Sequence, residues 1–79
     1  MLPKNHLIIA IDFDGTIVED AYPGIGEPLL FSFHTILKLQ KEGHRIILWT
    51  YRSGQKLQEA VDFCKENGIE LYAVNKNFP

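Results

Sequence analysis

Two carboxylates stand two residues apart, directly after an apolar run, where their type and spacing could support chemistry. The run is Leu7-Ile8-Ile9-Ala10-Ile11, and the segment that follows it is Asp12-Phe13-Asp14-Gly15-Thr16. Residues two apart on an extended chain point to the same side, so both carboxylates are expected to face one spot beyond the end of a strand. Two like charges that close repel unless a cation or a shared proton relieves them. A hard divalent cation that prefers oxygen ligands, such as Mg²⁺, fits this pair.

A second polar group follows the next apolar run, residues 45–50. Thr50 closes that run, and Arg52 and Ser53 come just before a predicted helix. The carboxyl ends of parallel strands lie at one edge of a sheet, which places these residues near the acid pair. A helix N-terminus also favours an anion. The sequence therefore predicts a phosphate held on Mg²⁺, where one carboxylate could attack phosphorus and the other could move the leaving-group proton.

The elements that must position these residues alternate along the chain. Apolar runs indicate strands, spacing at i, i+3, i+4 and i+7 indicates helices, and Gly and Pro mark the turns. Strands that alternate with helices imply a parallel sheet with right-handed crossovers, hence an α/β fold. The predicted elements are a strand at 7–11, a loop or small hairpin (the flap) at 15–27, a helix at 28–42, a strand at 45–50, a helix at 54–67 with Ser53 as N-cap, and a strand at 70–74.

Composition limits the class of protein. The 79 residues, 46% of them hydrophobic, make a single small domain over residues 1–79. A net charge of −2 with scattered Lys and Arg gives no basic stripe for nucleic acid. A single cysteine, Cys64, fits a reducing compartment, and the apolar start is too short for a signal peptide or a membrane span, so we expect a cytoplasmic protein without a membrane partner. Trp49 is expected in the core.

The run of residues 12–16 after a hydrophobic strand, with a second hydrophobic strand that ends in Thr50, resembles the first two motifs of the haloacid dehalogenase (HAD) superfamily of phosphohydrolases. The resemblance implies that Asp12 is the nucleophile and Asp14 the general acid and base. It implies a Mg²⁺ ion on the Asp12 carboxylate and the Asp14 backbone carbonyl, and a phosphoryl group on Thr50. Arg52, Ser53 and Gly15 complete the predicted phosphate-binding set. The implied fold is a Rossmann-like three-layer sandwich, with helices on both faces of a parallel sheet.

The resemblance covers the N-terminal half of the family's core domain. Members carry a third motif, a Lys or Arg, and a fourth, acidic motif, both after the third strand, and neither is in this sequence. Lys76 is a weak substitute for the missing cation, because it follows the third strand, roughly 10 Å from the first strand in the family's strand order. Without later strands, the strand at 7–11 becomes an apolar edge. We therefore expect either a fragment of a longer protein or self-association through this edge.

Simpler interpretations stay open for each of these residues. Asp12 and Asp14 could cap a local turn, Thr50 could be a plain strand residue, and Arg52 and Ser53 could be ordinary loop and cap residues.

Two functions remain for the chain. The first is a Mg²⁺-dependent phosphohydrolase, incomplete in this chain, with a short flap, an open site and a phosphorylated small-molecule substrate. The second is a non-catalytic module that binds metal and phosphate or self-assembles. A receiver domain fits less well, because Gly15 and Thr16 follow the acid pair and the third strand does not end in Asp.

Overall fold

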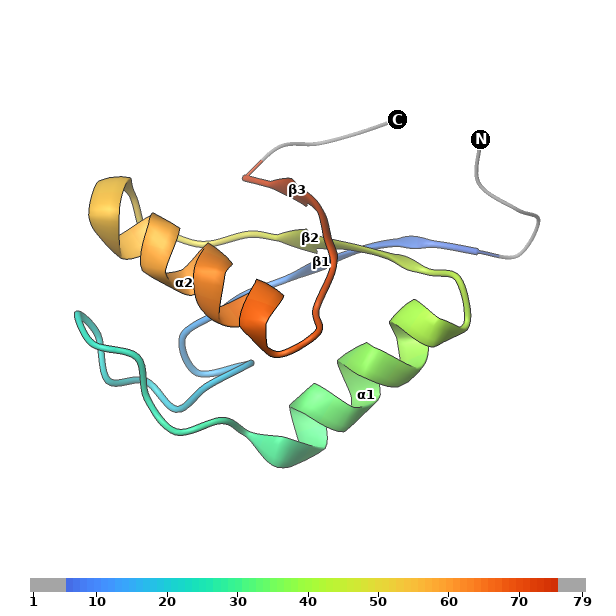
Figure 1. Ribbon diagram of the computed structural model, residues 1–79, viewed down its shortest axis with the longest axis horizontal. Coiled ribbons are helices and arrows are strands. Elements are labelled where there is room, and N and C mark those ends of the chain that lie inside the picture. The colour runs from blue at the N-terminus through green and yellow to red at the C-terminus, as the bar shows by residue number, and fades with distance from the viewer. Residues whose placement is uncertain (1–5, 76–79) are drawn as a thin grey trace.

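The chain forms one parallel sheet and two helices in alternating order. The computed structural model describes residues 6–75, and Figure 1 shows the strands running alongside one another with both helices beneath them. The predicted α/β class, with three parallel strands and two crossover helices, is confirmed. The elements are β1 (Ile8–Ile11), α1 (Leu30–Lys41), β2 (Arg45–Leu48), α2 (Gly54–Glu66) and β3 (Leu71–Val74).

The strand order is β1-β2-β3, so β1 is an edge of the sheet among the described residues. Ile8 lies opposite Arg45 and Ile11 opposite Leu48, all in parallel register. The β2–β3 ladder shifts register after Ile46. Because every strand runs the same way, the carboxyl ends of all three strands meet at one edge of the sheet.

Two element boundaries differ from the predicted ones by two residues, each for a local reason, and four others differ by one residue. The first helix begins at Leu30, not at residue 28, because Leu29 is extended and its N–H donates to the Ile17 carbonyl in the flap at 2.9 Å. The second strand ends at Leu48, not at residue 50, because the Thr50 N–H donates to the Asn75 side chain at 2.7 Å instead of to a neighbouring strand.

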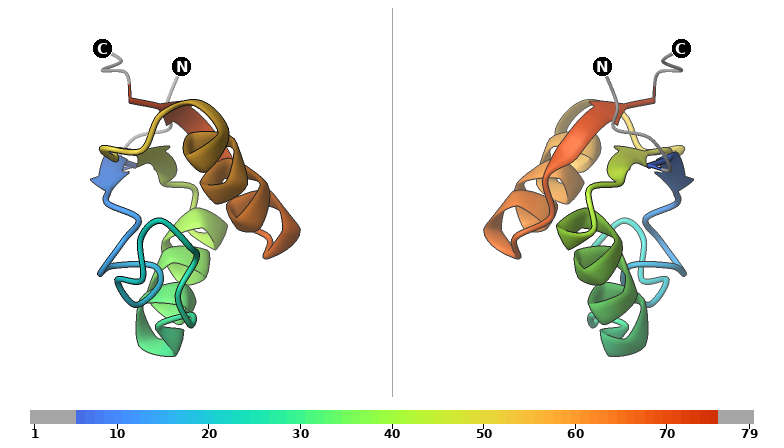
Figure 2. Two further views of the ribbon diagram at one scale, coloured as in Figure 1. Left: turned by 90° about the vertical axis from the view of Figure 1, so that its left-hand side faces the viewer. Right: turned by 90° about the vertical axis from the view of Figure 1, so that its right-hand side faces the viewer.

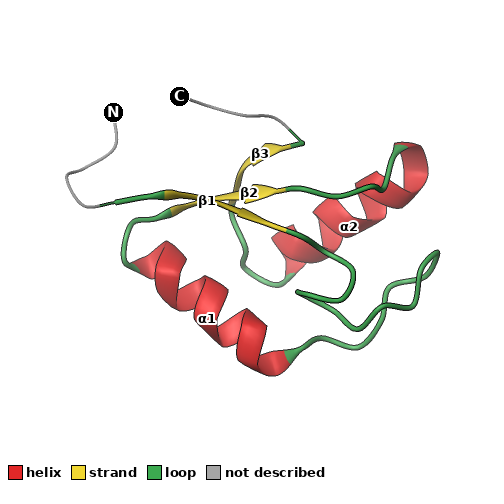
Figure 3. Cartoon of the chain, turned by 180° about the vertical axis from the view of Figure 1, so that it is seen from behind, coloured by secondary structure: helices red, strands yellow, loops and turns green. Residues whose placement is uncertain are grey.

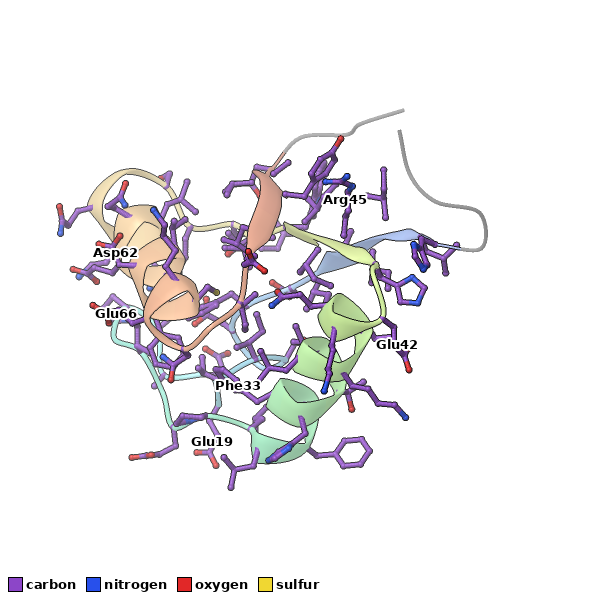
Figure 4. All side chains as sticks on the ribbon, turned by 45° about the vertical axis from the view of Figure 1, so that its right-hand side comes forward. Glu19, Phe33, Glu42, Arg45, Asp62 and Glu66 are labelled. Carbon is purple, nitrogen blue, oxygen red and sulfur yellow. The ribbon has the colours of Figure 1, made fainter. Side chains whose placement is uncertain are left out.

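Both helices lie on the same face of the sheet, as the two side views in Figure 2 show. The strand order runs in one direction along the sheet, and crossovers of a single hand then put successive helices on one side. Phe33 of α1 and Phe63 of α2 meet edge to face, with ring centroids 6.0 Å apart, and Figure 4 shows Phe33 between the two helices. The expectation of helices on both faces is therefore wrong for the described chain.

The core lies between this face and the two helices, and the turn after β1 reaches into it. Phe13, Ile17 and Val18 in that turn are fully buried, together with Leu48 of β2. Cys64 is buried on α2, as its helical spacing predicts. Buried side chains thus precede and follow Asp14, at Phe13 and at Ile17, and their packing fixes the path of the chain around it.

The sheet face without helices leaves aromatic residues exposed. Trp49, which directly follows β2, is 45% exposed, and Tyr72 of β3 is 41% exposed. The sequence places Trp49 in the core, and this prediction is wrong. An apolar run does not tell which of its two faces a helix will cover.

The predicted flap is a small hairpin that extends below the sheet, as the loop trace in Figure 3 shows. Its two arms are joined by a hydrogen bond from the Glu19 N–H to the Glu27 carbonyl, 2.8 Å long. The arms approach so closely that a Cβ at Gly26 would clash with the Glu19 carbonyl oxygen. The tip, residues 21–24, therefore has a defined position relative to the strand ends.

Candidate functional site

Asp12 is the exposed member of the acid pair. It follows β1 directly, and its Oδ1 accepts a hydrogen bond of 2.8 Å from the Phe13 N–H. Within the described residues, no hydrogen bond or ion pair involves its other carboxylate oxygen. An exposed carboxylate with a free oxygen at the carboxyl edge of a sheet can act as a nucleophile or as a metal ligand.

Asp14 is held in a different way from Asp12. Its Oδ2 accepts a hydrogen bond from Arg52 Nε at 2.8 Å, and its Oδ1 accepts one from Arg52 Nη2 at 2.7 Å. This is a two-point ion pair, and the Asp14 side chain in it is 19% exposed. The two carboxylates of the motif therefore start in unlike environments, one open to solvent and one paired.

Arg52 is the buried charged residue of the described chain, with 2% of its surface exposed. Besides Asp14, it donates to the carbonyls of Gly24, at 2.7 Å, and Lys56, at 3.3 Å, and more weakly to that of Pro23, at 3.5 Å. These contacts use all five N–H donors of a guanidinium. The hydrogen bond with Asp14 raises the pKa of Arg52 above its already high value, although burial acts against the charge.

The structure thus gives Arg52 a place different from both sequence interpretations. It is not an ordinary loop residue, because it is buried and ion-paired, and it has no donor left for a phosphate in this conformation. Its contacts direct it toward Asp14 and the flap tip. The sequence signal was limited to a cation at the correct end of a strand.

Thr50 lies beside Asp12 at the same edge. Its hydroxyl oxygen accepts a hydrogen bond from the Arg52 backbone N–H at 3.2 Å, and its own N–H donates to Asn75 Oδ1 at 2.7 Å. Asn75 directly follows β3 with a φ of +52°, a left-handed conformation that asparagine adopts more readily than most residues. Sequence reasoning missed Asn75, although a polar residue at the carboxyl end of the third strand was a usable signal.

The remaining predicted phosphate ligands have backbone roles. Ser53 occupies the N-cap position of α2 as predicted, but its hydroxyl makes no capping hydrogen bond. Gly15 has a φ of +83°, which favours glycine, and its N–H donates to the Val18 carbonyl at 2.8 Å. Ser53 is exposed at the start of α2, whereas the Gly15 amide is occupied within the turn.

Two surface depressions meet at Asp12, Thr50 and Tyr51. One, of about 460 Å³, extends toward the flap and the Asp14–Arg52 pair. The other, of about 490 Å³, extends over the helix-free face of the sheet. The first is also lined by Asp14, Asp20, Tyr22 and Arg52, and the second by Ala10, Trp49 and Asn75. The Asp12 carboxylate is therefore reachable from two sides.

The donor set fits part of a Mg²⁺ site. Asp12 offers a free carboxylate oxygen, and within residues 6–75 no hydrogen bond ends on the Asp14 backbone carbonyl. Hard oxygen donors of these two kinds suit Mg²⁺, which binds through one or two protein ligands and keeps several waters. The described residues contain no group of three His, Cys, Asp or Glu side chains placed to hold a metal. Lys76, the weak substitute for a catalytic cation, lies outside the described residues.

Comparison with known proteins places the fold but not the activity. No family model matches the sequence, and no curated protein matches it. A solved structure described as a conserved protein coded by a locus from Bacteroides thetaiotaomicron is 52% identical, with a TM-score of 0.83. The match covers 92% of this chain and 60% of that one, so this chain spans about three fifths of the length of its structural relative. In the described part of this chain, no helix has the length and apolar character to cross a bilayer.

Proposed function

We propose that this chain carries the nucleophile half of a Mg²⁺-dependent phosphohydrolase of the haloacid dehalogenase type. The observation that carries the proposal is the Asp12 carboxylate, exposed at the carboxyl edge of the sheet with one oxygen free and the Thr50 hydroxyl in the same depressions. The one local bond that Asp12 accepts, from the Phe13 N–H, leaves its second oxygen available for a substrate or a metal ion. The resemblance of residues 12–16 and Thr50 to the first two motifs of the family supports the same conclusion.

The proposed reaction has two steps. In the first, the free Asp12 oxygen attacks the phosphorus of a phosphomonoester, the bond from phosphorus to the leaving oxygen breaks, and Asp14 gives that oxygen a proton. In the second, Asp14 takes a proton from a water molecule, whose oxygen attacks phosphorus and releases inorganic phosphate from Asp12. Thr50 donates a hydrogen bond from its hydroxyl to a phosphoryl oxygen in both steps.

Asp12 and the Asp14 carbonyl are the residues that would hold Mg²⁺. When bound, the ion offsets the negative charge that carboxylate and phosphoryl oxygens bring together. The acid role of Asp14 requires one of its oxygens to leave the Arg52 guanidinium, since both accept from it here. The pair is thus a resting arrangement in this proposal.

Further groups are needed for full activity. The structural relative extends well beyond the matched region. We propose that residues equivalent to that extension, on the same polypeptide or on another subunit, supply the missing cation and the acidic metal ligands. The short flap leaves the site open, which suits a phosphorylated small molecule or an accessible phosphate on a larger one. The cytoplasmic location stays a prediction.

The experiment compares hydrolysis of an aryl phosphate with Mg²⁺ by the chain and by its Asp12→Asn variant. The substitution keeps the size of the side chain and removes its nucleophilic charge. Because further groups are needed for full activity, we expect slow Mg²⁺-dependent turnover, which the variant lacks, and a phosphorylated Asp12 peptide in mass spectra of acid-quenched wild type. Equal rates for the two proteins would refute the proposal.

The second candidate function is a metal- and phosphate-binding module without turnover. The occupied carboxylate of Asp14 favours it, because an acid locked by a guanidinium cannot transfer protons. This alternative predicts that Mg²⁺ and inorganic phosphate bind together in calorimetry, that Asp12→Asn abolishes this binding, and that neither protein hydrolyses the aryl phosphate.

A further inference from the structure

Arg52 joins three segments that are distant in sequence. Its guanidinium contacts Asp14 after β1, the Pro23 and Gly24 carbonyls at the flap tip, and the Lys56 carbonyl in the first turn of α2. The bond to Gly24, at 2.7 Å, is as short as the shorter bond to Asp14. The flap tip is therefore attached to the same side chain that orients the proposed acid.

Two aromatic rings complete the surroundings of the guanidinium. The ring centroids of Phe13 and Tyr22 both lie 5.1 Å from Arg52 Cζ. Phe13 is fully buried, whereas Tyr22 belongs to the flap tip and is 58% exposed. A planar guanidinium can stack on rings and bond at its edges simultaneously, which a lysine ammonium cannot do. The site is thus specific for arginine.

We propose that Arg52 is a positioning residue that couples the orientation of Asp14 to attachment of the flap tip. When Asp14 turns away from Arg52, the guanidinium loses its charged partner and the flap tip loosens; when the tip detaches, Asp14 is held less firmly. Such coupling is reciprocal by thermodynamic necessity. The inference deepens the proposed function, since Asp14 is its acid and base, and it gives the flap a role in access to the site.

The first experiment tests whether Asp14 controls the flap, to which its side chain makes no hydrogen bond within the described residues. A glutamate-specific protease can cut the hairpin after Glu19 when the flap opens, and the helix α2 after Glu59 when the fold opens. We expect Asp14→Asn and Arg52→Lys to speed cleavage in the hairpin by about tenfold, the ratio that loss of one strong hydrogen bond produces. Cleavage at Glu59 should change much less.

The matched control is Arg45→Lys. Arg45 also stacks on a tyrosine, with its Cζ 4.6 Å from the Tyr72 ring centroid, and Figure 4 shows it at the far end of the molecule from Asp62 on α2. This variant should leave hairpin cleavage unchanged. Hairpin cleavage that stays at the wild-type rate in Asp14→Asn, or that rises only in step with cleavage at Glu59, would overturn the coupling.

The second experiment tests the reverse direction with a spectroscopic signal. Tyr22→Ala removes an exposed ring from the flap tip, and we expect it to shift the Asp14 ¹³Cγ resonance and to speed hydrogen exchange at the Arg52 Nε–H. Tyr72→Ala is the control and should change neither. Unchanged signals in Tyr22→Ala would refute reciprocity. Neither experiment requires turnover, and Asp12→Asn should leave hairpin cleavage as it is, so failure of the coupling is distinguishable from failure of the proposed function.

Discussion

Removing either partner of the Asp14–Arg52 pair should cost a large part of the stability of this domain. The carboxylate accepts two charge-assisted hydrogen bonds, at 2.8 and 2.7 Å, and a bond of this kind is worth about 1.5–3 kcal/mol. Asp14 is partly exposed, which lowers the value, so we expect Asp14→Ala to reduce the free energy of unfolding by about 3 kcal/mol. A domain of 79 residues has a total of roughly 4–12 kcal/mol.

A double-mutant cycle isolates the pair from the other contacts of Arg52. Arg52→Met should cost at least as much as Asp14→Ala, because it also removes the bonds to the flap-tip carbonyls. The double variant should be less destabilised than the sum of the two, with a coupling energy of about 2 kcal/mol. Urea unfolding followed by circular dichroism gives the free energy of unfolding of wild type, the two single variants and the double variant. These values can be compared if the m-value is the same for all four proteins.

The Lys56–Glu59 pair on α2 is the internal reference. Its nitrogen and oxygen are 3.8 Å apart and both side chains are well exposed, so a cycle there should give about 0.5 kcal/mol or less. An Asp14–Arg52 coupling as small as that of the reference pair would refute the argument that burial and two-point geometry make the ion pair strong.

Three further predictions address other parts of the fold. Burial raises the pKa of the Cys64 thiol to about 11 from 9.0, so the folded state disfavours the thiolate. The free energy of unfolding should therefore keep its full value below pH 9 and fall by up to about 3 kcal/mol as the pH rises to 11. Urea unfolding of Cys64→Ala should show a flatter pH dependence. Asn75→Ala should leave the Thr50 amide without its partner and lower the free energy of unfolding by about 1 kcal/mol, measured by urea unfolding. It should also weaken phosphate binding, measured by calorimetry. Ala10→Pro should abolish the self-association expected for wild type in sedimentation equilibrium, while the variant keeps the wild-type circular dichroism spectrum. The carbonyls of alternate residues in β1 face β2, so the Ala10 amide points to the free edge, where a proline cannot donate to a second chain. A wild-type chain that is monomeric at high concentration would contradict the last one.

The backbone of this protein was predictable because its signals are local. The apolar run before Asp12 and the helical spacing that includes Cys64 each identify an element from a few neighbouring residues. Parallel strands follow from the alternation of elements, and this alone brings Asp12 and Thr50 to one edge. The exposed position of Asp12 beside Thr50 therefore needed no long-range information.

The role of Arg52 could not be predicted because its partners are distant in sequence. Asp14 is 38 residues away and Gly24 is 28 away, and only the path of the flap brings the Gly24 carbonyl to the guanidinium. No local pattern encodes that path. Trp49 was misplaced for a related reason, since a strand that is covered on one face and a strand that is covered on both can have the same apolar sequence.

The exposed position of Trp49 makes it an intrinsic fluorescence probe of the candidate site. It is the single tryptophan of the sequence, and it lines the same depression as Asp12 and Thr50. A half-solvated indole emits at longer wavelength than a buried one, and a ligand that settles beside it displaces water from the ring. Binding of Mg²⁺ and phosphate to the unlabelled chain can therefore be followed by tryptophan fluorescence, without any hydrolysis of a substrate.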